Sequence, residues 1–146
     1  MKNNKSRNGF TLIELIIVMV ILGIMAAVAV PRYLDSIANA EESAEDAVIS
    51  AIKSGLKQYA NNSLVENGRA SWPTDPFDAL SELPAGYSED GSRADTDGEW
   101  TYNTTTLKIT HQRQDNTKYT WSYDKGTNDD AASNAVGDGI GARASL

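Results

Sequence analysis

The hydrophobic residues of this chain are concentrated in one block close to the N-terminus. All sixteen residues from 15 to 30 are apolar, Gly or Ala, and the block reaches back to Phe10 with only Thr11 and Glu14 as polar members. A helix of about 20 residues spans the hydrocarbon core of a bilayer. Residues 10–30 therefore predict a helix that is long enough to cross a membrane.

An amphipathic pattern follows Pro31 without a polar linker. Its apolar residues recur mostly three or four positions apart, which predicts one apolar stripe on a helix. They are Tyr33, Leu34, Ile37, Ala44, Val48, Ala51, Ile52, Leu56 and Tyr59. The acids of the early turns are expected on the exposed side, and they are Asp35, Glu41, Glu42, Glu45 and Asp46. The helix is predicted to end near Asn61 and Asn62, after about 50 residues or roughly 75 Å, with its apolar first half protruding from a globular head.

The second half of the chain predicts a loop followed by a small sheet. Residues 63–98 contain Pro73, Pro76 and Pro84 and predict a loop, whose apolar residues Trp72, Phe77, Leu80 and Leu83 are expected to pack on the head. Three runs then alternate with period two, which predicts antiparallel strands. They contain Trp100 and Tyr102; Leu107, Ile109 and His111; and Tyr119, Trp121 and Tyr123, with a turn near residues 114–116.

These patterns predict an α+β fold, in which a long N-terminal helix packs on a three- to four-stranded antiparallel sheet. The aromatic and aliphatic face of the sheet is expected to cover the second half of the helix. The other face carries Thr, Lys, Ser and Gln and is expected to meet water. The tail, residues 126–146, is rich in Gly, Ala, Asn and Asp and predicts a packed irregular loop or a segment without fixed structure.

Charge and composition narrow the function. The net charge of −7 argues against general affinity for nucleic acids, because phosphate binding needs basic patches. The chain has no cysteine and one histidine, so no apparatus for acid–base or metal-assisted hydrolysis is visible. His111 is expected at a solvated or core-edge position. We therefore predict that the chain is no enzyme and needs no cofactor or metal.

Two acidic clusters are candidates for calcium sites. They are formed by Asp95, Asp97 and Glu99, and by Asp129, Asp130 and Asp138. Neither spacing matches a calcium-binding pattern, so solvated loop acids are the preferred interpretation.

The first nine residues carry Lys2, Lys5 and Arg7 and no acid. A basic start before an apolar run is typical of a membrane-targeting segment whose positive end stays in the cytoplasm. A secretory signal cut near residues 26–29 and an uncleaved signal anchor are both compatible with this hydropathy. Glu14 argues against an ordinary signal anchor, because a carboxylate near the membrane interior is costly unless it has a partner.

The segment Gly9-Phe10-Thr11-Leu12-Ile13-Glu14 resembles the prepilin peptidase site of type IV pilins and of type II secretion pseudopilins. The close resemblance runs from Lys5 to about Asp35 and includes Pro31. It implies a leader of residues 1–9 that is cut after Gly9, and a Phe10 amine that is then N-methylated. It also implies that Glu14 pairs with a Phe10 amine, its own or that of a neighbouring subunit. The alternative is a Glu14 that only favours the helix N-terminus through the helix dipole.

Pro31 marks a predicted weak point of the long helix. Proline removes a helical hydrogen bond and clashes with the preceding turn, so a kink or local melting is expected there. Gly23 is a second weak point. The resemblance implies that the segment between them loses helicity when a filament forms, whereas a fixed kink is the simpler alternative.

The resemblance implies a structural subunit with three regions: the leader (residues 1–9), a transmembrane and filament-core helix (residues 10–30), and the rest of the helix with the head (residues 31–146). Its implied partners are further copies in a helical homopolymer, a prepilin peptidase and methylase, an assembly platform, and the inner membrane before export to the cell surface. Pseudopilin and signal-anchored binding domain are the alternatives. Adhesion, twitching motility, DNA uptake and electron transfer all stay open as the filament's task.

Overall fold

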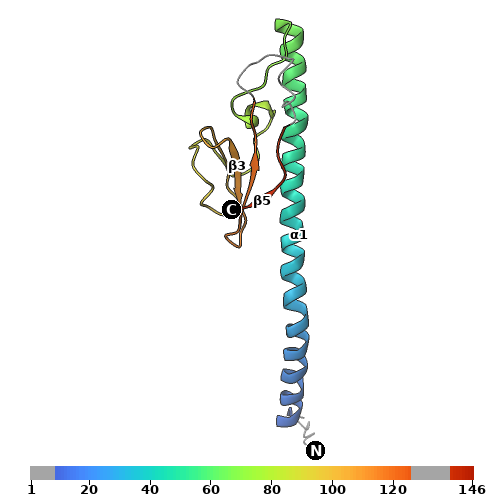
Figure 1. Cartoon of the computed structure of the whole chain (residues 1–146). Helices are drawn as coiled ribbons and strands as arrows, with labels where there is room; N and C mark the ends of the chain where they lie inside the picture. Colours follow the sequence, from blue (N-terminus) through green and yellow to red (C-terminus); the bar gives the residue numbers. More distant parts are fainter. Residues whose placement is uncertain (1–8, 126–138) are drawn as a thin grey trace, which may run out of the picture. The chain divides into compact units, whose positions relative to one another are not determined.

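The computed structural model describes residues 9–125 and 139–146 (Figure 1). The described residues divide into two compact units, with the boundary between Glu42 and Ser43. Its elements are the helix α1 (Leu12–Asn67), the 3-10 helix η1 (Pro76–Ala79) and the strands β1 (Tyr87–Ser88), β2 (Trp100–Asn103), β3 (Lys108–Gln112), β4 (Lys118–Ser122) and β5 (Ala144–Ser145). Helix α1 contributes residues to both units. We call its part in the first unit the stem and the second unit the head.

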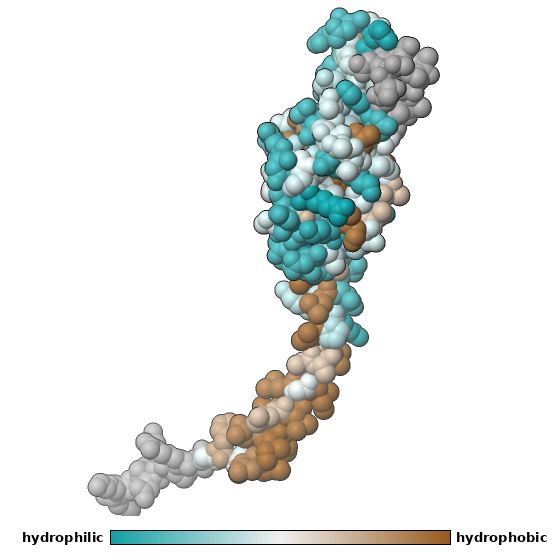
Figure 2. Space-filling model, turned by 60° about the vertical axis from the view of Figure 1, so that its left-hand side comes forward, coloured by the Kyte–Doolittle hydropathy of each residue, from teal (hydrophilic) through white to brown (hydrophobic). Residues whose placement is uncertain are grey.

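The stem is an apolar helix with exposed side chains. Its large hydrophobic residues from Leu12 to Leu34 are each at least 45% exposed, and hydrophobic colours dominate this segment in Figure 2. The most apolar 18-residue window of α1 has a mean hydropathy of 2.9, so the helix is apolar and long enough to cross a membrane. This confirms the predicted apolar helix, with its start at Leu12 rather than Phe10.

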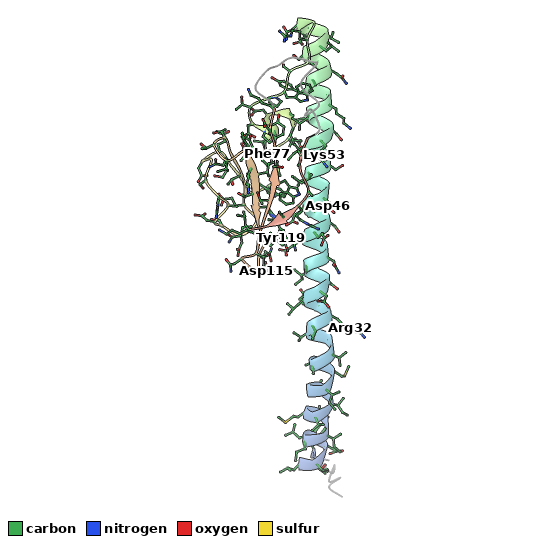
Figure 3. All side chains as sticks on the ribbon, viewed as in Figure 1. Arg32, Asp46, Lys53, Phe77, Asp115 and Tyr119 are labelled. Atoms are coloured by element: carbon green, nitrogen blue, oxygen red, sulfur yellow. The ribbon has the colours of Figure 1, made fainter. Side chains whose placement is uncertain are left out.

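Pro31 lies inside α1, which is assigned as helix on both sides of it. Exposed side chains surround this position, including that of Arg32, which is labelled in Figure 3. Since proline has no N–H, one backbone carbonyl in the preceding turn lacks its usual helical donor. The predicted kink or melting at Pro31 stays a prediction.

In the head, the buried face of α1 overlaps the predicted stripe only in part. The buried residues of this helix are Glu45, Ile49, Ile52, Leu56, Ala60 and Ser63. Ala44, Ala51 and Tyr59 from the predicted stripe are exposed. Ile52 and Leu56 of the predicted stripe are buried, so the stripe is confirmed in part. Glu45 was wrongly expected on the exposed side, because its bonding partners lie 66 or more positions away along the chain.

The helix also ends later than predicted. It continues through Asn67, where Gly68 follows with a φ of +68°. A glycine in this left-handed conformation is a common way to end a helix, because it has no side chain to clash. The prediction that the helix ends near Asn61 and Asn62 was therefore wrong by about one and a half turns of α-helix.

The sheet has the order β1-β2-β3-β4-β5. The three predicted strands are confirmed as β2, β3 and β4, which pair antiparallel with Trp100 opposite His111 and Ile109 opposite Trp121. The predicted sheet of three to four antiparallel strands is confirmed, since β5 also pairs antiparallel with β4. The sheet differs from the prediction in one further strand, β1, which pairs parallel with β2. Each edge strand has only two residues, which is too short for an alternating pattern.

The core of the head lies between α1 and the aromatic face of the sheet, as predicted. Ile52 and Leu56 of α1 are fully buried, as is Phe77 of η1, which is labelled in Figure 3. They join a cluster that also contains Ile49, Trp100, Tyr102, Ile109, Trp121, Tyr123 and Ile140. Trp72 and Leu80 pack partly against it, whereas Leu83 is 52% exposed and was wrongly predicted to pack.

The opposite face of the sheet meets water only in part, which corrects the prediction for this face: Lys108 and Ser122 are exposed, whereas the threonines are not. Thr101, Thr110 and Thr120 are buried. The Thr101 hydroxyl donates to the Ser92 carbonyl at 2.7 Å, and the Ala94 N–H donates to the Thr110 hydroxyl at 3.0 Å. The loop before β2 thus covers part of this face, and the hydroxyls of Thr101 and Thr110 bond to its backbone.

Candidate functional site

The Gly9–Phe10 junction lies outside regular structure and is exposed. Phe10 is 92% exposed, and apart from the chain neighbours of Gly9, no atom of the described residues lies within 4 Å of the position where a Cβ on Gly9 would be. Helix α1 begins two residues after Phe10. A peptide bond that is accessible and outside regular structure is one that a protease active site can bind.

Thr11 and Glu14 form a reciprocal cap at the start of α1. The Thr11 carbonyl accepts the Leu15 N–H at 3.3 Å, so Thr11 is the N-cap residue. The Glu14 N–H donates to the Thr11 hydroxyl at 3.3 Å. The carboxylate atom Oε2 of Glu14 in turn accepts the Thr11 N–H and the Thr11 hydroxyl, both at 2.8 Å. This is a capping box, whose Thr-x-x-Glu signature was present in the sequence but was not used in the prediction.

The capping box gives Glu14 partners within its own chain. Both bonds that Glu14 accepts end on Oε2, and Oε1 accepts none from the described residues. A carboxylate can accept about four hydrogen bonds in total. Glu14 can therefore cap α1 and still receive a further donor. Gly9, Phe10 and Glu14 come together at this end of the helix, whereas Pro31 lies more than four turns further along.

A second polar cluster, which the sequence analysis missed, lies inside the head. Glu45 is 0% exposed, although it was predicted on the exposed side of the helix. Its Oε1 accepts the Arg113 Nε–H at 2.7 Å and lies 3.0 Å from His111 Nδ1. Its Oε2 accepts from Arg113 Nη2 at 2.7 Å and from Arg143 Nη1 at 3.0 Å. We call these four residues the Glu45 cluster.

The Glu45 cluster holds its carboxylate in the ionised form. Burial by itself would raise the pKa of Glu45, but the bonds from Arg113, His111 and Arg143 outweigh it and lower the pKa below the usual 4.5. Arg113 makes a bidentate contact with both oxygens of Glu45, which is the strongest geometry for an Arg–carboxylate pair. A carboxylate with both oxygens engaged is a poor general base, so the cluster is structural.

Aromatic rings enclose the cationic side of the Glu45 cluster. The Trp100 and His111 rings stack with centroids 4.2 Å apart. The guanidinium carbon of Arg113 lies 4.1 Å from the ring centroid of Tyr119 on β4, and that of Arg143 lies 5.5 Å from it. His111 is 8% exposed, so its core-edge prediction is confirmed and its solvated alternative is not.

The predicted acid clusters give no metal site among the described residues. The Glu99 carboxylate accepts the N–H groups of Asp95 and Thr96 at 2.8 and 3.1 Å. Asp97 accepts from the Gln112 amide at 3.0 Å. These acids therefore serve loop structure. Asp129, Asp130 and Asp138 lie outside the described residues.

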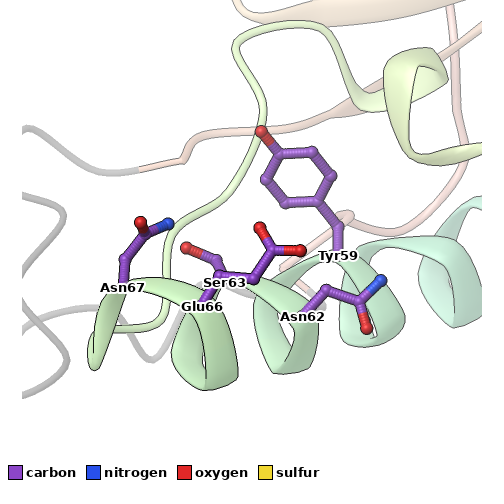
Figure 4. A pocket seen from close by; sticks show the side chains of 5 residues that line it. All are labelled: Tyr59, Asn62, Ser63, Glu66 and Asn67. Atoms are coloured by element: carbon purple, nitrogen blue, oxygen red, sulfur yellow. The ribbon is translucent and has the colours of Figure 1, made fainter.

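The head surface has shallow hollows. One near the end of α1 has a volume of about 270 Å³ and is lined by Tyr59, Asn62, Ser63, Glu66 and Asn67 (Figure 4). Its side chains include one carboxylate and no histidine or cysteine. It contains no pair of groups suited to acid–base or nucleophilic chemistry.

This chain is similar to known proteins in its N-terminal motif and over part of its length. Residues 4–30 match the family model described as the prokaryotic N-terminal methylation motif. The chain is 42% identical over 72 residues to the type IV major pilin protein PilE of Neisseria gonorrhoeae, which covers 49% of this chain and 40% of that protein. It is 52% identical over 46 residues to the type IV narrow pilus major component PilA5 of Thermus thermophilus, covering 32% of this chain and 40% of that one.

A fimbrial protein of Pseudomonas aeruginosa is 43% identical over 53 residues, covering 36% of this chain and 34% of the relative. The chain thus spans no more than about 40% of the length of these curated relatives. No solved structure matches the chain.

Proposed function

We propose, from the likeness of this chain to type IV pilins, that it is the structural subunit of a type IV pilus-like filament. The observation that carries the proposal is the methylation motif of residues 4–30 at the start of an exposed apolar helix. The relatives are named as pilins and fimbrial proteins, which favours a pilin over a pseudopilin. A structural subunit of this kind needs no catalytic site.

Processing is proposed at the Gly9–Phe10 bond, with N-methylation of the new Phe10 amine. The exposure of Phe10 and the open space around Gly9 support access by a peptidase. Cleavage of the leader removes three of the 13 basic residues and none of the 20 acidic ones. Processing therefore makes the chain ten charges negative by its side chains, which favours soluble, mutually repelling heads.

The stem is proposed to anchor the chain in the inner membrane first and to pack with further copies in the filament afterwards. Its large hydrophobic side chains from Leu12 to Leu34 are exposed, and exposed apolar surface of this extent marks a membrane or protein contact. A prepilin peptidase and an assembly platform are the partners that this route requires.

Glu14 is proposed to receive the methylated Phe10 amine during assembly. A cation among packed apolar helices is costly without a partner. Oε1 of Glu14 accepts no bond from the described residues, while Oε2 stays with Thr11. The pair would fix the axial register of an incoming subunit, and the capping box would satisfy the carboxylate before that partner arrives.

The N-terminus of the mature protein tests processing directly. Mass spectrometry of the chain from membranes and from sheared cell-surface filaments is expected to show a first residue of Phe10 with one added methyl group. An intact Met1 would contradict the proposal and favour a signal-anchored monomer. Recovery of the processed chain from membranes only, with none in the sheared fraction, would favour a pseudopilin.

The role of Glu14 is tested by comparing Glu14→Gln with Glu14→Ala. Glutamine can still complete a capping box but carries no charge, whereas alanine removes both functions. We expect normal cleavage in both variants and at least a tenfold loss of sheared filaments in each. Normal filament yield from Glu14→Gln would refute the charge pairing and leave Glu14 with the capping role alone. Glu41→Gln, a neutralised acid elsewhere on α1, serves as the control.

A further inference from the structure

The last residues of the chain lie along the outer edge of β4. The Gly141 N–H donates to the Ser122 carbonyl at 2.9 Å, and the Leu146 N–H donates to the Lys118 carbonyl at 3.0 Å. Between these bonds β5 pairs with Tyr119 and Thr120. Ile140 is 7% exposed and belongs to the core cluster. Residues 139–146 therefore cover an edge that would otherwise present open backbone groups.

This segment is also bound to α1 through an ion pair. Arg143, directly before β5, donates from Nη1 to Oε2 of Glu45 at 3.0 Å. The other two partners of Glu45, His111 and Arg113, come from the end of β3. One buried carboxylate on α1 thus connects the helix with the sheet and with the C-terminal segment.

We propose that residues 139–146 form a releasable strap over the edge of β4, fastened to α1 by the Glu45–Arg143 pair. The chain has no cysteine, so every contact that holds the strap is noncovalent. The strap shields the β4 edge from pairing with other chains while it is closed, since open strand edges invite intermolecular association.

The three arms of the Glu45 cluster differ in a way that lets the strap open alone. The side chain of Arg113 is 6% exposed and makes two bonds to Glu45, whereas that of Arg143 is 24% exposed. When Arg143 leaves, Arg113 and His111 still bond to the carboxylate, so no unpaired buried charge remains. Opening the strap therefore costs the head much less than breaking the Arg113 arm does.

The backbone of the strap is short and poor in large side chains. Its strand contributes two residues, and Gly139, Gly141 and Ala142 flank the single buried anchor, Ile140. Small residues give the backbone freedom to move. Local opening of such a segment needs less free energy than global unfolding, because few buried contacts are lost.

Hydrogen exchange on the full chain in detergent micelles tests the strap, with Arg143→Gln as the variant and Arg93→Gln as the control. Arg93 is exposed on the head, so the control removes an equal charge without touching the cluster. In Arg143→Gln we expect the Gly141 and Leu146 amides to exchange at least tenfold faster, with less than a twofold change in β2 and β3. Unchanged strap amides, or equal acceleration throughout the head, would overturn the proposal.

A disulfide provides a second, independent test. A Cβ on Gly141 would lie 3.6 Å from the Cβ of Ser122, within the usual range of about 3.5–4.5 Å for a disulfide. Adding Ser122→Cys and Gly141→Cys to Arg143→Gln is expected to abolish the fast exchange at Leu146 when oxidised and to restore it on reduction. Fast exchange at Leu146 in the oxidised protein would show that the strap does not move as one unit.

Discussion

At the scale of single residues, Glu45 is the most consequential position of the head. A fully buried carboxylate is expensive, and only good geometry with several donors offsets the loss of water. Here the donors come from positions 111, 113 and 143, so the bond network closes only when the helix, sheet and C-terminal segment are all in place. The Glu45 cluster therefore stabilises only the correctly folded head.

The ionisation of Glu45 predicts that the head loses stability in acid. Its pKa is lowered in the folded state because the bonds from Arg113, His111 and Arg143 outweigh the effect of burial. A carboxyl with a lowered folded-state pKa stabilises the fold above its unfolded pKa, and this contribution is lost as the pH falls through the folded value. Unfolding by urea should therefore show a free energy that falls below about pH 4.5.

Glu45→Gln separates this effect from the other acids. At pH 7 we expect the variant to lose about 3–5 kcal/mol, the usual cost of breaking a buried pair. Its free energy of unfolding should then depend less on pH between about 2 and 4.5 than that of the natural chain. Asp46→Asn, an exposed neighbour on α1, is the matched control and should leave both the stability and its pH dependence unchanged. An equal acid slope in Glu45→Gln would assign the loss to other carboxylates.

The burial of Glu45, Thr101 and Thr110 could not be predicted from the sequence. Polar residues are mostly exposed, so a rule based on residue type places them outside. Their partners lie far along the chain: Glu45 bonds to Arg113 across 68 positions, and Ala94 bonds to Thr110 across 16. Such pairs follow from tertiary contacts, which no local period reports.

At the scale of elements, the start of α1 is set by local chemistry. Thr11 and Glu14 satisfy backbone groups that every helix leaves open at its N-terminus. This signal needs only four consecutive residues, so it was available in the sequence. It fixes the helix start at Leu12 and leaves the Gly9–Phe10 bond outside the helix.

Thr11→Val tests the capping box with almost no change in side-chain size. Valine lacks the hydroxyl that accepts the Glu14 N–H and donates to the Glu14 carboxylate. Loss of an N-cap costs about 1 kcal/mol, so the Glu14 amide should exchange roughly fivefold faster in micelles. Thr11→Ser keeps the hydroxyl and should behave like the natural chain. Equal exchange in all three proteins would show that the cap does not stabilise the helix start.

The strands whose apolar and polar residues alternate were predicted, and the strands without such alternation were not. The alternation of Trp100 and Tyr102, and of Tyr119, Trp121 and Tyr123, located β2 and β4 correctly. The edge strands have two residues each, so alternation carries no information there. The pairing of β1 depends on a bond from the Trp100 N–H to the Gly86 carbonyl, which only the folded loop provides.

At the scale of the whole molecule, the chain divides between two environments. The stem exposes its large hydrophobic residues, whereas the head has a core of its own drawn from α1, η1 and the sheet. The division falls between Glu42 and Ser43, inside the single helix α1. One half of this helix therefore exposes apolar side chains, while the other half belongs to the core of a folded unit.

This division predicts that residues 43–146 fold without the stem. Their core cluster contains no stem residue, and Ser43-Ala44-Glu45-Asp46 has the Ser-x-x-Asp form that can cap a shortened helix. The acids of that first turn also favour a helix N-terminus. We expect a monomer by light scattering in detergent-free buffer and a dispersed NMR spectrum. Its midpoint of thermal unfolding should lie within about 5 °C of the head transition in the full chain, because loss of the preceding helix costs about 1 kcal/mol or less.

The full chain under the same conditions is the control, and it should associate without detergent because its stem exposes apolar surface. A fragment that is folded but associates as strongly would place the association surface in the head. A fragment with a collapsed NMR spectrum would show that the stem is needed for folding. Either result would contradict the prediction that the stem causes association and that the head is an independently stable, acidic domain.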